Sequence, residues 1–306
     1  MSTKFQFGLP GSKMEENKNE KWILLLILAL IWGSSFILIK KSLIYYSPYE
    51  VGSLRILISS LLLLPYALKN IRKFPRKQIK YLVIAALCGN FLPMYLFPLA
   101  ETQISSAVAG ILNSMVPIFV IILGSLFWNT QTSKVQITGT LISFFGVVLL
   151  TLGAGDAGEL KIIPILLLLL ATLLYAINGL TVKTHLTRVE PKLLSAYIFG
   201  LVLFFPSLIA LFLTGFFGSS SYVGIEWTGL LYVCLLSVFG TGLAMMLNYR
   251  LLRVSSALFT STVTLLIPVV AILWGILDGE KLGALQMIGA AVIVGGLVFL
   301  RQGKTT

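Results

Sequence analysis

The chain has 306 residues, of which 57% are hydrophobic and only 11% are charged. Soluble domains average about 45–50% apolar and about 25% charged residues, so this composition excludes an ordinary water-soluble fold. The formal net charge of +12 raises the question of nucleic-acid binding. Because the basic residues lie in short connections between apolar runs and form no stripe or arm, we expect no nucleic-acid partner.

Apolar runs of about twenty residues are long enough to cross a hydrocarbon core of about 30 Å as helices. The first run, Trp22 to Ile39, is too long for a signal-peptide core and lacks a clear cleavage site. The predicted spans cover residues 22–39, 48–68, 81–100, 104–127, 135–153, 162–182, 193–214, 227–248, 255–277 and 283–300. Residues 1–21 read as a solvated cytoplasmic tail, in which Met14 is a second candidate start. We therefore predict an all-α membrane protein with ten transmembrane helices.

Lysine and arginine residues are distributed unevenly between the two sides of this arrangement. If the N-terminus lies inside, 18 of the 23 fall on the inner side, four on the outer side, and Arg55 within a span. The four outer residues are Lys40, Lys41, Lys161 and Lys281. Since positively charged loops stay in the cytoplasm, we expect both termini inside and an even number of spans.

Two patterns from the first half of the chain recur in the second half. At an offset of 143 residues, Trp32-Gly33, Lys40 and Pro48 correspond to Tyr175-Ala176, Lys183 and Pro191. At an offset of 150, Ser105-Ser106-Ala107, Pro117 and Gly139 correspond to Ser255-Ser256-Ala257, Pro268 and Gly289, with the proline slipped by one. Five spans per half is an odd number, so the second copy must enter the membrane from the opposite side. We expect inverted repeats over 22–153 and 154–306, an arrangement suited to alternating access.

Further residues extend this pattern: ALIWGSSF at 29–36, Leu54-Arg55, and Gly279-Glu280 before the last span. Over residues 22–300 the chain resembles the EamA type of the drug/metabolite transporter superfamily. The resemblance implies ten helices in two inverted repeats, cytoplasmic termini, and transport of amino acids, related metabolites or drugs. The first half has Asn129-Thr130 where the second has Glu280. This acidic position is not duplicated, which weakens a coupling role for Glu280.

A solute site is expected near the bilayer midplane between the halves, where polar and aromatic side chains are too costly to face lipid. The predicted substrate-binding residues lie near the centres of their spans: Trp32, Asn90, Tyr95, Asn113, Tyr175, Asn178 and Thr241. For Asn90 and Asn113, an interhelical hydrogen bond is the alternative role.

Arg55 is predicted about two turns inside the second span, where an isolated cation costs at least about 2.5 kcal/mol. Its partner is expected to be a substrate carboxylate, helix-end carbonyls, or Glu50 or Glu101. Pro117 and Pro268 each remove a backbone hydrogen bond near the middle of a span. They are predicted either to act as hinges or to form fixed kinks that shape the cavity.

Residues that carry metal or catalytic chemistry are sparse. Cys88 and Cys234 lie inside apolar spans and indicate neither a disulfide nor a metal site. His185 is the only histidine and is expected in a cytoplasmic loop, and the carboxylates lie at or near span ends. Proton coupling and facilitated diffusion therefore both stay open. There is no Walker lysine motif, and we expect neither an enzyme nor a bound cofactor or metal.

These observations favour transport of a small solute across a bacterial-type inner membrane, with the protein embedded in lipid as a multi-pass carrier. Amino acids or related compounds, and export as the direction, are expected mainly from the resemblance. The alternatives are multidrug-type efflux and a non-transporting scaffold or lipid-handling protein. An open polar cavity between the halves would favour transport, and a centre filled with side chains would favour the scaffold.

Overall fold

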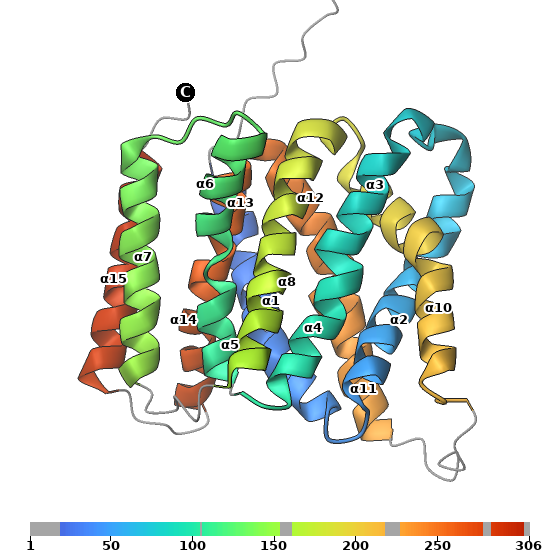
Figure 1. Ribbon diagram of the computed structural model, residues 1–306, viewed down its shortest axis with the longest axis horizontal. Coiled ribbons are helices and arrows are strands. Elements are labelled where there is room, and N and C mark those ends of the chain that lie inside the picture. The colour runs from blue at the N-terminus through green and yellow to red at the C-terminus, as the bar shows by residue number, and fades with distance from the viewer. Residues whose placement is uncertain (1–18, 105, 154–160, 218–226, 278–282, 303–306) are drawn as a thin grey trace, which may run out of the picture.

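The computed structural model describes residues 19–104, 106–153, 161–217, 227–277 and 283–302, and within these ranges it is helical with no strand. The expected tail before residue 19, Met14, Ser105 and Gly279-Glu280 lie outside the described residues. Figure 1 shows the helices standing side by side with roughly parallel axes, α7 and α15 at one edge of the bundle and α2 and α10 at the other.

The first half of the chain runs from α1 to α7. Its elements are α1 (Glu20–Ser42), α2 (Pro48–Lys69), the short 3₁₀ turns η1 (Ile71–Lys73) and η2 (Arg76–Gln78), α3 (Ile79–Ala86), η3 (Leu87–Phe91), α4 (Leu92–Glu101), α5 (Ser106–Asn113), α6 (Val116–Phe127) and α7 (Lys134–Gly153). Because α3, the π-helical η3 and α4 follow one another without a break, they form one continuous apolar segment.

The second half runs from α8 to α15. Its elements are α8 (Ile162–Thr181), η4 (Val182–Leu186), α9 (Pro191–Ala196), η5 (Tyr197–Leu203), α10 (Phe204–Leu213), α11 (Trp227–Ser237), η7 (Val238–Leu243), α12 (Ala244–Val254), α13 (Ala257–Ser261), α14 (Val263–Leu277) and α15 (Ala284–Gln302). The elements η4, η5 and η7 are π-helical, so three segments of this half contain wide turns.

Seven segments of the described chain are long and apolar enough to cross a bilayer. They are Glu20–Ser42, Pro48–Lys69, Arg76–Glu101, Ala109–Phe127, Ile162–Leu186, Pro191–Leu213 and Trp227–Val254, and three shorter apolar helices are Lys134–Leu150, Ala257–Val270 and Ala284–Leu300. Each predicted span overlaps one of these segments. The large side chains Leu213 and Trp227 are 78% and 75% exposed, which suits a surface in contact with lipid. Ten crossings and cytoplasmic termini stay predictions.

Local residues explain where several helices begin. Ser47 caps α2 in a capping box, in which its side chain accepts from Glu50 N and the Glu50 carboxylate accepts from Ser47 N. Pro48 and Pro191 stand in the first turns of α2 and α9, where a missing N–H costs nothing. Ser256 caps α13 through Phe259 N. Glu50 is therefore engaged at the exposed start of α2.

The two halves enter the bundle from opposite faces. In Figure 1, α1 descends from the upper face, whereas α8 ascends from the lower face. Contacts between the halves pair in the same way: α1 packs against α11 and α14, and α8 packs against α4 and α6. The helices α2 and α7 pack against η5 and α15. This arrangement is an inverted repeat, because α1 and α8, which correspond in the sequence repeat, run in opposite directions and each packs against the other half.

Two hydrogen bonds join residues that are 150 positions apart. Ser114 Oγ donates to Thr264 O at 3.1 Å, and Ser143 Oγ donates to Ile293 O at 3.1 Å. Both bonds link residues at the offset that the sequence repeat predicts. Counterpart residues can touch only where they lie close to the local twofold axis that relates the halves, so these bonds mark that axis.

The helices α7 and α15 cross closely because small residues line their contact. A Cβ atom added at Gly146 would lie 2.7 Å from Ile293 N, and one added at Gly139 would lie 2.7 Å from Leu300 N. Lipid tails are as apolar as leucine, so helices in a membrane associate through close packing and interhelical hydrogen bonds. The glycines of this pair therefore hold one edge of the bundle together.

Candidate functional site

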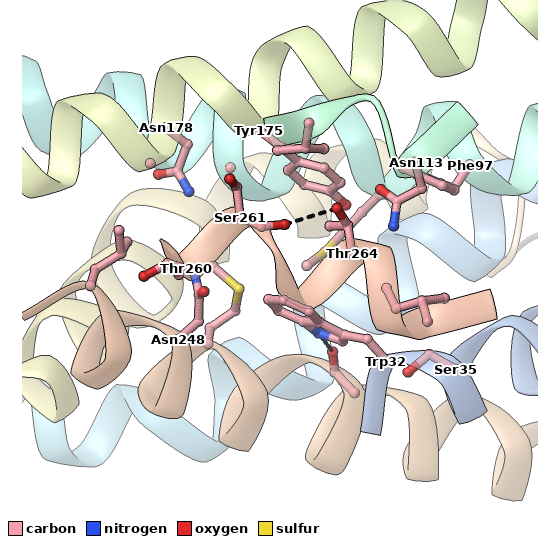
Figure 2. Close-up of a pocket in the computed structure, with 18 of the residues that line it drawn as sticks. Trp32, Ser35, Phe97, Asn113, Tyr175, Asn178, Asn248, Thr260, Ser261 and Thr264 are labelled. Carbon is pink, nitrogen blue, oxygen red and sulfur yellow. Dashed lines mark hydrogen bonds between the residues drawn. The ribbon is translucent and has the colours of Figure 1, made fainter. Parts of the chain in front are cut away.

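A cavity of about 120 Å³ lies between the two halves, and Figure 2 shows many of the side chains that line it. We call it the central cavity. The first half contributes Trp32, Ser35, Phe36, Ile39, Arg55, Gly89, Met94, Phe97, Asn113, Val116 and Val120. The second half contributes Tyr175, Asn178, Gly179, Gly240, Met245, Asn248, Leu252, Ala257, Thr260, Ser261, Thr264 and Ile267. Among these lining residues, Arg55 carries the only formal charge.

The lining of the central cavity is built from repeat counterparts. At the offset of 143, Trp32, Ser35 and Phe36 of α1 correspond to Tyr175, Asn178 and Gly179 of α8. At an offset of 151, Gly89, Met94 and Phe97 correspond to Gly240, Met245 and Asn248. The central cavity therefore lies at the interface of the two halves, between surfaces that correspond in the repeat. Carriers built from inverted repeats hold their solutes at this interface.

Two wide turns, η3 and η7, occupy matching positions beside the central cavity. The side chain of Asn178 packs on Gly89 in η3, and a Cβ atom at Gly240 in η7 would lie 2.6 Å from Ser35 Oγ. Asn178 and Ser35 are themselves repeat counterparts. A side chain at either glycine would occupy the space that Asn178 or Ser35 fills, so the two glycines allow these counterpart side chains to pack on the turns. Single π-helical turns inside longer helices occur frequently at functional sites.

Arg55 is held by groups of the η7 turn. Its Nε donates to Thr241 Oγ1 at 2.6 Å and its Nη2 donates to Gly240 O at 3.4 Å. Trp32 Nε1 donates to the same Gly240 carbonyl at 3.1 Å. The side chain is only 7% exposed, and these acceptors are neutral. A π-helical turn provides such acceptors because its wider hydrogen-bond pattern disturbs the regular pairing of backbone carbonyls.

Aromatic rings close one part of the central cavity. Phe97 lies between Phe36 and Tyr175, with ring centroids 5.9 Å apart in each pair. The repeat counterparts of Phe36 and Phe97 are Gly179 and Asn248. A Cβ atom at Gly179 would meet no atom of the described chain within 4 Å. The central cavity is therefore filled by aromatic rings on one side of the local axis and open on the other.

Both proline-containing spans are broken near the central cavity. The first divides between α5 and α6, just before Pro117, and the second divides between α13 and α14, with Pro268 inside α14. Pro268 has no N–H, which frees the carbonyl four residues earlier, and this Thr264 carbonyl accepts the bond from Ser114. The breaks shape the wall of the central cavity, and a hinge role for either proline stays a prediction.

The predicted site residues fall into two groups. Trp32, Asn113, Tyr175, Asn178 and Arg55 line the central cavity. The remaining three are not among its lining residues.

Each of those three has another described contact. Asn90 Nδ2 donates to Tyr249 Oη at 3.4 Å, an interhelical bond. Tyr95 Oη shares a hydrogen bond of 3.0 Å with Ser53 Oγ and lines a separate hollow between α2, α4 and α10. Thr241 accepts the Arg55 bond.

Several lining residues were not predicted from the sequence: Ser35, Phe97, Asn248, Thr260, Ser261 and Thr264. A signal for one wall does exist. The pattern Gly-x-x-Leu-x-Met-x-Leu occurs at 89–96 and again at 240–247. This repeat at offset 151 points to the wall that contains Met94 and Met245.

Groups of three or more potential metal ligands do not occur among the described residues. Cys88 and Cys234 are free and half-buried. The chemistry available in the central cavity is therefore hydrogen bonding, one positive charge and apolar contact, which suits recognition of a small solute.

Known proteins resemble this chain along nearly its whole length. An uncharacterized transporter of Archaeoglobus fulgidus is 27% identical over 281 residues, covering 91% of this chain and 97% of that protein. The uncharacterized inner membrane transporter YedA of Escherichia coli is 27% identical over 292 residues, covering 92% of this chain and 90% of that protein. A solved structure described as "Crystal structure of protein" shares the fold, with a TM-score of 0.70, 17% identity, and coverage of 91% of this chain and 95% of that chain.

The model of the EamA-like transporter family matches the chain twice, over residues 20–152 and 162–302. The two matches coincide with the two halves that pack around the central cavity. This multi-pass membrane protein therefore belongs to the EamA-like transporter family.

Proposed function

We propose that the protein exports a small metabolite, such as an amino acid or a related compound, across a bacterial-type cytoplasmic membrane. The observation that carries the proposal is the central cavity, which is lined by counterpart residues of two inverted halves. In such an arrangement, exchange of conformation between the halves exposes one site to each face in turn. The repeats over 22–153 and 154–306 are the moving units of this proposal.

Size and charge favour a small, weakly charged solute. A volume of about 120 Å³ is below the 300–1,000 Å³ that is typical of pockets for drug-sized ligands. A metabolite of amino-acid size fits this space better than a multidrug substrate does. Recognition of a multiply charged anion such as a sugar phosphate calls for several cations, and Arg55 is the one charged lining residue.

Polar and aromatic residues of the central cavity are proposed to contact the solute. Trp32, Asn113, Tyr175 and Asn178 offer rings and amide groups within a mostly apolar wall. Polar side chains are costly inside a membrane unless they pair or serve a solute path. Asn90, Tyr95 and Thr241 are proposed to support the site through the bonds described above.

Counterflow into liposomes tests the proposal directly. Purified protein is reconstituted, the liposomes are loaded with unlabelled solute, and entry of each labelled amino acid is followed with and without a pH gradient. Gly179→Phe places a ring in the open side of the central cavity and is expected to abolish counterflow. Gly295→Phe is the matched control, because Gly295 lies on the exposed face of α15 with open space at its Cβ position.

The outcomes separate the competing functions. Counterflow of amino acids that is lost in Gly179→Phe and kept in Gly295→Phe supports the proposal. Counterflow of large cationic drugs alone would favour multidrug efflux. If no solute enters while a known transporter works in parallel, the transport proposal fails and a scaffold or lipid-handling role takes its place.

A further inference from the structure

Arg55 has hydrogen-bonding capacity that the protein does not use. A guanidinium group offers five N–H donors, and among the described residues Arg55 donates only from Nε to Thr241 and from Nη2 to Gly240 O. Its Nη1 therefore has no described protein acceptor, although the side chain is 93% buried and lines the central cavity. No hydrogen bond or ion pair between Arg55 and Glu101, at the end of α4, occurs among the described contacts, and Glu101 is not a lining residue.

Two amide oxygens of the central cavity are also unused. Asn113 Oδ1 and Asn178 Oδ1 are buried and have no hydrogen-bond donor among the described residues. Both side chains are 4% exposed and line the central cavity. In the view of Figure 2 the two amides lie on either side of Tyr175. A buried acceptor without a donor is unfavourable, and most such atoms in proteins have a partner.

We propose that Arg55 binds the carboxylate of the transported solute and that Asn113 and Asn178 bind its amine. The inference rests on the proposed function and names its substrate class: neutral amino acids, with one carboxylate and one amine on the same molecule. Arg55 provides charge-assisted N–H donors for the carboxylate. The amide oxygens accept from the ammonium group, which supplies the donors that Asn113 Oδ1 and Asn178 Oδ1 lack within the described protein.

The remaining wall indicates what the rest of the solute looks like. Apart from Arg55 no lining residue is charged, and Met94, Met245 and Val116 present apolar surface. An additional charge on the solute would have no partner of opposite sign there. A side chain without charge, such as that of leucine, matches this wall.

Four related compounds separate the contribution of the solute's carboxylate from that of its amine. The probes are L-leucine, L-leucine methyl ester, 3-methylbutylamine and 4-methylpentanoate, and sets built on alanine and phenylalanine cover smaller and larger side chains. Each compound is tested as a competitor of labelled leucine counterflow and, separately, as a ligand that raises the unfolding temperature of the detergent-purified protein. The second readout reports binding without transport.

The expected result is a specific coupling between Arg55 and the carboxylate. In the wild type, the ester and the amine bind about tenfold to a hundredfold more weakly than leucine, the range for a lost charge-assisted hydrogen bond. In Arg55→Gln, leucine loses this advantage and binds like its ester. Arg55→Lys, which keeps the charge without the fork, retains part of the advantage. Arg253→Gln, at an exposed position of α12, leaves all four affinities unchanged.

A second pair of variants tests the inference independently, in case the Arg55 variants misfold. Asn113→Ala and Asn178→Ala are expected to weaken leucine and 3-methylbutylamine several-fold and to leave 4-methylpentanoate unchanged. If leucine is transported but binds no more tightly than its ester in the wild type, or keeps its full advantage over the ester in folded Arg55→Gln, the inference is overturned while the proposed function stands. If leucine and its analogues neither bind nor move while another solute does, the substrate class is wrong.

Discussion

Two adjacent glycines of α15 differ in what a methyl group would meet. At Gly296 an added Cβ would lie 2.7 Å from Ser143 N and 2.8 Å from Gly139 O, whereas at Gly295 it would meet no described atom within 4 Å. Both changes to alanine alter helix propensity equally, by about 1 kcal/mol. The propensity change cancels in the comparison. The difference in free energy of unfolding between the two variants therefore measures the clash at Gly296. Overpacking in a well-packed core typically costs about 1–3 kcal/mol.

We expect Gly296→Ala to be less stable than Gly295→Ala by this amount. The clash involves backbone atoms of α7, which cannot rotate away, so the helices must separate. Thermal unfolding of the purified protein in one detergent, followed by tryptophan fluorescence, gives the order of stability, and titration with a denaturing detergent gives the free-energy difference. Equal stability of the two variants would refute the assignment of α7 and α15 as a contact held by close backbone approach.

Three further predictions concern single bonds and orientation. Ser114→Ala loses the bond to the Thr264 carbonyl and is expected to destabilise the protein by about 0.6 kcal/mol in the same titration, the average for interhelical hydrogen bonds in membranes; no change would mean that water replaces the hydroxyl. Arg250→Gln breaks the 2.7 Å ion pair between Arg250 and Glu20, whose side chains are 37% and 34% exposed, respectively. The free energy of unfolding is therefore expected to fall by about 0–1 kcal/mol, and the effect is expected to vanish in high salt. In a chain without its native cysteines, Lys161→Cys should react with an impermeant maleimide in intact cells and Arg188→Cys should not, and the reverse pattern would invert the predicted orientation.

The helical segments were predictable from the sequence for a simple physical reason. A backbone in hydrocarbon must satisfy its own hydrogen bonds, so long apolar runs can only be helices. The first run at 22–39 and the run at 48–68 correspond to α1 and α2, and Pro48 sits where α2 begins. The wide turns were not predicted, because nothing in a local apolar run distinguishes an α-helical turn from a π-helical one.

These wide turns explain part of the difference between the predicted and observed lining. Asn90 and Thr241 lie in η3 and η7, and in each turn the neighbouring glycine, Gly89 or Gly240, lines the central cavity. A π-helical turn holds more residues than an α-helical turn and so rotates the residues that follow around the helix axis. The position of a residue along its span therefore predicted its depth in the membrane well, but it predicted poorly whether the side chain faces the central cavity.

The partner of Arg55 also required the tertiary structure. Its burial inside a span predicted a partner, and the sequence left carbonyls, acids and a solute as alternatives. The observed acceptors, Thr241 and the Gly240 carbonyl, are more than 180 residues away in sequence. Glu50, one of the acids considered, is engaged in the cap of α2.

By itself the sequence determined that this protein is a helical membrane protein made of two related halves, because composition, span length and repeat spacing are properties of the chain alone. The odd number of predicted spans in each half also implied their opposite polarity. The tertiary structure decided which faces meet, since the direction of each side chain depends on helix rotation and on wide turns. Only folding brings Arg55, Asn113 and Asn178, from three different helices, to the wall of one cavity.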